Sequence, residues 1–164
     1  IMQYEKLSKK AVSCMFVATL VQVIITSAIF GGILLIFGEY FTQIVKNIII
    51  GIILLDILYM IVSPKVRYER YRYSITEDAI DVKEGFLFIE RNIVPIERLH
   101  KIAIEKGPID RMFNLSKVIV TTAGGDITIR FLEDDKAEFI ADSLKNKINK
   151  IAIESRLNKR ENLL

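Results

Sequence analysis

Two long apolar runs in the first part of the chain limit what it can fold into. The first extends from Ala11 to Gly38 without a charged residue, and the second from Ile44 to Val62. About 20 apolar residues are enough for a helix to cross a hydrocarbon core of about 30 Å. We therefore expect two transmembrane helices, over about residues 11–37 and 44–62. Because only Glu39–Gln43 separates them, the helices must form an antiparallel hairpin.

The apolar residues divide the chain into two parts. They make up 51% of its 164 residues, and the excess over an ordinary soluble chain lies in the two runs. We place the border near Pro64, with a transmembrane hairpin over residues 1–64 and a second domain over residues 65–164. The net charge of +3 gives no reason to expect nucleic-acid binding, which needs a basic face or stripe.

Basic residues lie at both outer ends of the hairpin, whereas the turn between the helices carries Glu39. Lysine and arginine are enriched on the cytoplasmic side of membrane proteins. We therefore predict a multi-pass protein of the cell membrane, with both termini and residues 65–164 in the cytoplasm. The basic residues after the second run act as a topology signal and are also a candidate patch that contacts anionic membrane lipid. They are Lys65, Arg67, Arg70 and Arg72.

One acidic residue, Asp56, lies well inside an apolar run. A carboxylate in a membrane costs several kcal/mol unless it is paired, hydrogen-bonded or protonated. In an antiparallel hairpin, Asp56 falls at roughly the depth of a polar stripe on the first helix, which is formed by Thr19, Gln22 and Thr26. Two interpretations stay open. Either the stripe satisfies the acid, or these residues belong to a proton or substrate path or meet a basic group of another subunit.

The chain beyond Pro64 alternates apolar and polar residues, as half-buried strands do. A short helical turn follows Gly107–Pro108, with Asn114 as a left-handed cap, and Gly124–Gly125 is expected to form a two-residue hairpin turn. An amphipathic helix begins at the acidic segment Glu133–Asp135. Six strands are predicted, over residues 70–75, 80–82, 86–94, 99–106, 117–122 and 126–131. The fold class is therefore α+β: a transmembrane hairpin followed by a PH-like β-barrel or sandwich with a C-terminal helix.

Several motifs of this domain resemble those of a known family. They are Pro64–Tyr73, Pro95–Leu99, Gly107–Phe113 and Thr122–Gly125. They are similar to the motifs of the bacterial PH-like domain family of membrane proteins typified by YdbS and YdbT. The resemblance covers about residues 11–145, including the hairpin. Asn114 departs from it, because glycine is expected there, although asparagine tolerates the same backbone conformation.

The resemblance implies a non-enzymatic protein that forms a membrane complex with a larger, multi-domain relative. The residues agree in offering no catalytic, cofactor-binding or metal site: His100 is the only histidine and Cys14 the only cysteine. A metal cluster or a Ser-His-Asp triad therefore lacks partners. Phosphoinositide binding is not expected either, because the first loop between strands carries Glu77 and Asp78, with Asp81 close by, and these would repel a phosphorylated headgroup.

Two hypotheses for function follow. In the first, the chain is a membrane-anchored module that assembles with a second membrane protein of the same family or with copies of itself, in support of export of, or protection against, membrane-active compounds. The docking candidates are sheet edges and the basic end of the last helix, although this end is equally expected to be a solvated tail; its residues are Lys145, Lys147, Lys150 and Arg156. In the second, the chain is a transporter-type subunit that uses Asp56 and the polar stripe.

Overall fold

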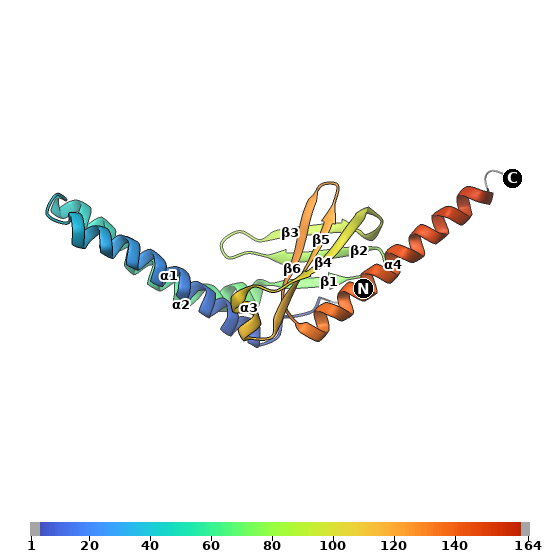
Figure 1. Cartoon of the computed structure of the whole chain (residues 1–164), viewed down its shortest axis with the longest axis horizontal. Helices are drawn as coiled ribbons and strands as arrows, with labels where there is room; N and C mark the ends of the chain where they lie inside the picture. Colours follow the sequence, from blue (N-terminus) through green and yellow to red (C-terminus); the bar gives the residue numbers. More distant parts are fainter. Residues whose placement is uncertain (1–3, 162–164) are drawn as a thin grey trace.

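The computed structural model describes residues 4–161, so residues 1–3 and 162–164 of the two predicted domain ranges lie outside it. Helices α1 (Lys10–Phe37) and α2 (Gln43–Arg70) run antiparallel and project from the rest of the molecule (Figure 1). Both are long and apolar enough to cross a membrane. Their apolar side chains are mostly exposed, as expected for residues that face lipid.

Helix α2 does not end near Val62 but continues through Pro64 to Arg70. The apolar run ends where predicted, whereas the helix extends about 12 Å further, at 1.5 Å per residue. Pro64 is buried within the helix, and the last turn is held by Tyr68, whose hydroxyl donates a hydrogen bond to the Leu7 carbonyl at 3.0 Å. The predicted border at Pro64 therefore falls inside a continuous helix, because tertiary contacts outweigh the helix-breaking tendency of proline.

The β domain consists of two antiparallel sheets, each with three strands. The first has the order β1-β2-β3 and the second β4-β5-β6, with helix α4 (Asp134–Glu161) packed against them (Figure 1). The six strands confirm the predicted α+β, PH-like fold. The strands are β1 (Arg72–Ile75), β2 (Ala79–Glu84), β3 (Glu90–Pro95), β4 (Leu99–Glu105), β5 (Leu115–Thr122) and β6 (Gly125–Glu133); η1 (Ile96–Arg98) precedes β4 and α3 (Pro108–Met112) follows it.

Two local predictions were wrong, whereas the short helical turn after Gly107–Pro108 and its left-handed cap were confirmed. The third strand begins at Glu90 rather than at Phe86, because the ladder between β2 and β3 closes at the pair Glu84–Glu90. The β5–β6 turn consists of Ala123 and Gly124, since Gly125 is already paired with Thr122. Asn114 does adopt the left-handed conformation, with φ of 54°.

One hydrophobic core joins the β domain to the start of the hairpin. Val118, Val120 and Ile129 are fully buried between the sheets and α4. Ala11 and Met15 of α1 belong to the same core. The hairpin and the β domain therefore share one core that includes residues from both sides of the predicted border at Pro64. Both helices of the hairpin are fixed to the domain.

Candidate functional site

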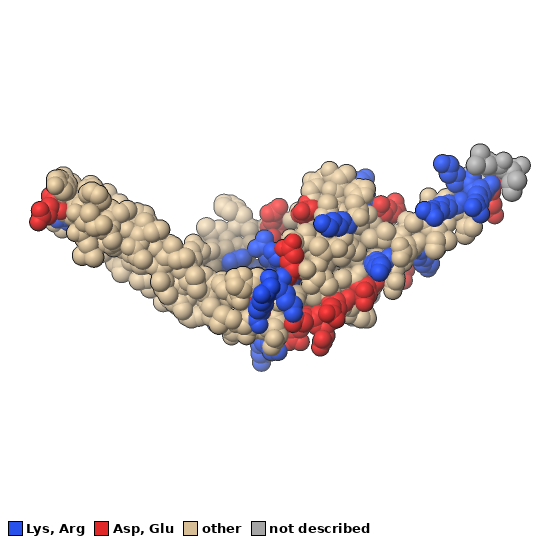
Figure 2. All heavy atoms as spheres, in the orientation of Figure 1, with Lys and Arg blue, Asp and Glu red and all other residues tan. Residues whose placement is uncertain are grey.

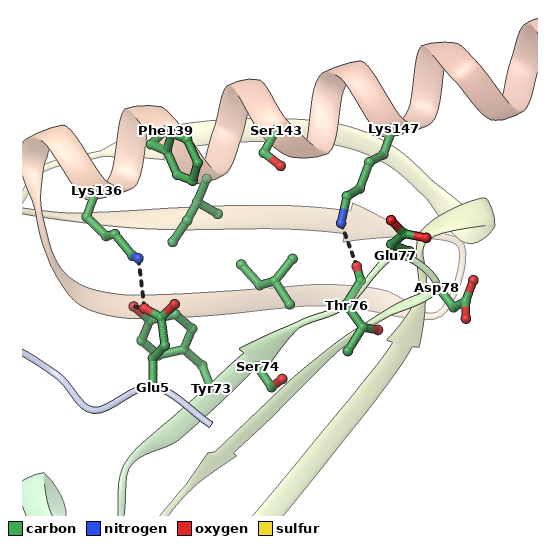
Figure 3. A pocket seen from close by; sticks show the side chains of 12 residues that line it. Glu5, Tyr73, Ser74, Thr76, Glu77, Asp78, Lys136, Phe139, Ser143 and Lys147 are labelled. Carbon is green, nitrogen blue, oxygen red and sulfur yellow. Dashed lines mark hydrogen bonds and ion pairs between the residues drawn. The ribbon is translucent and has the colours of Figure 1, made fainter. Parts of the chain in front are cut away.

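An open groove of about 690 Å³ lies between the edge of the first sheet and helix α4 (Figure 3). One wall is formed by strand β1 and the β1–β2 turn, and the other by the first turns of α4. The residues that line it are Glu5, Tyr73, Ser74, Ile75, Thr76, Glu77, Asp78, Lys136, Phe139, Ile140, Ser143 and Lys147.

The wall formed by β1 includes the outer edge of this strand, which no other strand of the sheet covers because β1 is the first strand in the order. A short N-terminal segment bonds to this edge: the Glu5 N–H donates to the Tyr73 carbonyl at 2.8 Å, and the Tyr73 N–H donates to the Glu5 carbonyl at 3.4 Å. Main-chain groups alternate in direction along a strand. The N–H and C=O of Ile75 therefore point toward the same side as those of Tyr73, into the groove.

Lys136 closes the hairpin-proximal end of the groove. Its Nζ lies 2.8 Å from Oε2 of Glu5, and the Tyr73 hydroxyl donates to the same oxygen at 2.9 Å (Figure 3). The hydrogen bond from Lys136 holds the pKa of the Glu5 carboxyl below its usual range. Burial raises the pKa of the Tyr73 phenol, and the bond to Glu5 raises it further. Glu5 is therefore ionised at neutral pH and Tyr73 is neutral.

Lys147 crosses the other end of the groove, where its Nζ donates to the Thr76 carbonyl at 2.7 Å (Figure 3). Phe139 lies on α4 between the two lysines and is 68% exposed. The groove thus combines a strand edge, two ammonium groups and an exposed aromatic ring. This combination suits an extended peptide, which can pair its main chain with a sheet edge while its side chains occupy flanking pockets.

Only one of the four predicted docking residues, Lys147, lines this groove. Lys145 precedes it by two residues and lies about 200° around the helix, on the opposite side. Lys150 and Arg156 are exposed further along α4, where the helix extends beyond the sheets (Figure 1). The sequence did not predict that Lys136, Phe139 and Ser143 line a groove. They alternate with the buried Ala137 and Ile140, so their pattern is that of the solvated face of an ordinary amphipathic helix.

In the predicted intramembrane site, two of the polar side chains form hydrogen bonds within their own helix. The Thr19 hydroxyl donates to the Met15 carbonyl at 2.7 Å, and the Thr26 hydroxyl to the Gln22 carbonyl at 2.9 Å. Such back-bonding satisfies a hydroxyl within its own helix. Across residues 4–161, no hydrogen bond joins Asp56 to this stripe. A role for Asp56 therefore stays a prediction.

The predicted basic patch lies where the hairpin meets the β domain. Arg70 donates to the Phe86 carbonyl in the loop between β2 and β3, and Arg72 donates to the Tyr71 carbonyl at the end of α2, at 2.6 Å. Lys65 is exposed, and Arg67 is half-buried. Figure 2 shows charged side chains over the β domain and at the turn of the hairpin, with an uncharged flank of the hairpin between them.

The loop considered for headgroup binding lies at the far end of β1, since β1 starts next to the end of α2 and runs away from the hairpin (Figure 1). Glu77 and Asp78 are exposed there, whereas Asp81 is 1% exposed and paired with Arg91. The predicted repulsion of a phosphorylated headgroup therefore rests on Glu77 and Asp78 rather than on Asp81, and it stays a prediction. Within the described part of the chain, no three His, Cys, Asp or Glu side chains lie close enough to hold a metal ion.

Comparison with known proteins bears out the resemblance. Residues 16–148 match the bacterial PH domain family. The chain is 33% identical over 89 residues to "UPF0699 transmembrane protein YdbS" of Bacillus subtilis (strain 168), a match that covers 54% of this chain and 56% of YdbS. It is 26% identical over 77 residues to "UPF0699 transmembrane protein YdbT" of the same organism, covering 46% of this chain and 16% of YdbT. No solved structure matches it.

Proposed function

This chain belongs to the bacterial PH domain family, and from that membership we propose that it is a membrane-anchored assembly module. The hairpin crosses the membrane twice and holds the PH-like domain at the cytoplasmic surface. The groove between β1 and α4 receives an extended segment of a second membrane protein of the same family. The chain brings partner subunits together and carries out no chemistry itself.

The bond between Glu5 and Tyr73 is the observation that carries this proposal. The outer edge of β1 pairs there with an extended segment of the chain through an isolated antiparallel bridge, which supports strand addition at this edge. The next outward-facing residue on this edge is Ile75, and α4 supplies a wall for the side chains of an incoming peptide. Strand addition of this kind gains affinity from main-chain hydrogen bonds and specificity from flanking pockets.

The choice of partner rests on the two relatives. Bacillus subtilis contains both YdbS and YdbT, and this chain matches each of them. Similar lengths of match cover 56% of YdbS but only 16% of YdbT, so YdbT is the longer protein. A short and a long member in one membrane favour a complex between them. We propose that such a complex supports the export of membrane-active compounds or protects the cell against them. This part of the proposal rests on the family resemblance alone.

The orientation follows from charge. The last turn of α2 is basic, with Arg67 and Arg70, whereas the turn of the hairpin carries Glu39. This distribution favours the β domain on the cytoplasmic side.

Photo-crosslinking in native membranes tests the proposal. A photoreactive residue in place of Ser143, which lines the groove, is expected to cross-link to a longer membrane protein of this family. The control position is Lys145, on the opposite side of α4, where no such adduct is expected. Adducts of Ser143 with copies of this chain, or adducts at Lys145 alone, would contradict the proposed partner.

A main-chain substitution tests the mode of binding. Ile75→Pro removes the outward N–H without removing a bond to β2, so the cross-link at Ser143 should be lost. Ile75→Val keeps the N–H and a similar side chain, and should retain it. Equal cross-linking in both variants would rule out strand addition to β1.

A further inference from the structure

The loop between β2 and β3 exposes apolar side chains in succession. Leu87, Phe88 and Ile89 are 77%, 89% and 61% exposed. A run of exposed apolar residues is unfavourable in water and marks a surface that contacts something apolar. The sequence pattern predicted that this segment begins the third strand. In the structure it is a loop, and the side chains of Leu87, Phe88 and Ile89 do not reach the core.

The loop lies beside the end of the second apolar run. The ring of Phe86 packs edge to face on the ring of Tyr59 of α2, with centroids 5.2 Å apart and an angle of 82° between the rings. Tyr59 precedes Val62, the last residue of the apolar run, by three positions, which is about 4.5 Å along a helix. Figure 1 shows this loop reaching back from the β domain toward the hairpin. The loop therefore lies at the depth where the hydrocarbon core of a membrane would end.

The conformation of the loop is set by its first residue. Gly85 has φ of 143°, a conformation that favours glycine, and a Cβ there would collide with the Phe88 carbonyl oxygen. The main chain thus turns back on itself and holds the side chains of the tip outward. Arg70 fixes the loop to the helix through its bond to the Phe86 carbonyl.

We propose that Leu87, Phe88 and Ile89 insert into the boundary between headgroups and acyl chains, in the membrane leaflet nearest the β domain. The inference rests on the proposed insertion of the hairpin, and it adds a second attachment of the domain to the lipid. Glu84 and Glu90 face each other at the base of the loop and limit insertion to the tip, because carboxylates stay in the aqueous layer.

The position of the loop favours lipid over a protein as its neighbour. The loop is continuous with the lipid-facing surface of α2 through Tyr59. Lys65 and Arg67 follow on the same helix, at the level of anionic headgroups. Tyrosine, the residue type of Tyr59, is enriched at this depth in membrane proteins.

Tryptophan fluorescence in vesicles tests this inference, because the chain contains no tryptophan. Single variants of the full chain, Phe88→Trp, Phe139→Trp and Leu54→Trp, are reconstituted into vesicles of phosphatidylcholine and phosphatidylglycerol. Quenching is measured with lipids brominated on the acyl chain and with acrylamide in the water. Phe139 is an exposed aromatic residue of α4, and Leu54 is an exposed residue inside the second apolar run.

The expected result is that Phe88→Trp is quenched several-fold more by brominated lipid than Phe139→Trp, and less by acrylamide. If Phe88→Trp responds like Phe139→Trp while Leu54→Trp is quenched by lipid, the loop inference is wrong and the hairpin still inserts. If brominated lipid quenches none of the three, the insertion of the hairpin is wrong. Protection of Phe88→Trp from both quenchers would indicate a covering protein and would also overturn the inference.

Discussion

Asp81 on β2 accepts a forked hydrogen bond from Arg91 on β3, with Arg91 Nη2 2.6 Å from Asp81 Oδ2 and Nε 3.1 Å from both carboxylate oxygens. The hydroxyl of Tyr4 donates to Oδ2 as well, at 2.6 Å. Lys83 lies over the ring of Tyr4, with its Nζ 4.4 Å from the centroid. A buried carboxylate on the first sheet therefore fixes the N-terminal segment that leads into the groove.

The Asp81–Arg91 pair should make stability depend on pH. Hydrogen bonding to Arg91 lowers the pKa of Asp81 in the folded protein. A carboxyl with a lowered folded pKa adds stability above its unfolded pKa, near 4, and this stability is lost as the pH falls through the folded pKa. We expect the urea midpoint of the wild type to decrease below about pH 4, and the midpoint of Asp81→Asn to be lower at neutral pH and less dependent on pH. Parallel pH profiles for the two proteins would contradict this.

The packing of α4 on the sheets should dominate the stability of the β domain. Leu144 is fully buried, so Leu144→Ala leaves a cavity and should lower the free energy of unfolding by about 3 kcal/mol. Leu157 is 55% exposed on the same helix, and Leu157→Ala should change it by less than about 0.5 kcal/mol. Urea denaturation in detergent, followed by circular dichroism, measures both values. Similar losses for the two variants would show that α4 is not packed on the sheets as described.

The Lys136–Glu5 ion pair should add little to the hold of the N-terminal segment on the edge of β1. The Lys136–Glu5 ion pair joins side chains that are 40% and 51% exposed, and such pairs are worth at most about 1 kcal/mol. We expect Lys136→Ala to speed hydrogen exchange of the Tyr73 amide by up to about five-fold, the equivalent of that energy. Lys145→Ala, which removes a lysine from the other side of α4, should leave the rate unchanged. An unchanged exchange rate in Lys136→Ala would mean that this ion pair does not help to hold the segment.

Replacement of Asp56 separates the two hypotheses for function. The described residues give its carboxylate no hydrogen bond to Thr19, Gln22 or Thr26, so Asp56→Asn should leave folding and the Ser143 cross-link unchanged. Loss of a cellular transport phenotype with an intact cross-link would favour the transporter-type role. Loss of the cross-link itself would place Asp56 in the interface between subunits.

The glycine at the start of the β2–β3 loop should resist substitution. Gly85→Ala requires a backbone conformation that side chains rarely adopt and should cost about 2 kcal/mol. Gly124→Ala is the control, because the nearest atom to its Cβ would be 3.8 Å away. Thermal unfolding of both variants in detergent measures the difference. Equal unfolding temperatures would show that the loop is not held in this shape.

The regular elements of this fold were predictable because their patterns are local. Continuous apolar runs marked α1 and α2, alternation marked five of the strands closely, and the acidic start with a helical period marked α4. Asn114 was also predictable, because a left-handed residue after a short helix favours asparagine.

The errors arose where contacts distant in sequence decide the structure. Phe86–Ile89 has the composition of a strand, but Phe86 packs on Tyr59 and the ladder closes at Glu90. The groove was not predictable for the same reason. Its walls bring together Glu5, Tyr73 and Lys136, and no local pattern indicates that these three residues meet.

The continuation of α2 past Pro64 has a mechanical consequence. The helix enters β1 almost without a linker, since Arg70 ends the helix and Arg72 begins the strand. The start of α1 is embedded in the same packed interior, so no swivel point separates the membrane part from the groove. In the proposed arrangement, two helices that tilt to fit a thinner bilayer would tilt the groove with them, and the angle at which the groove meets the proposed partner would change with bilayer thickness.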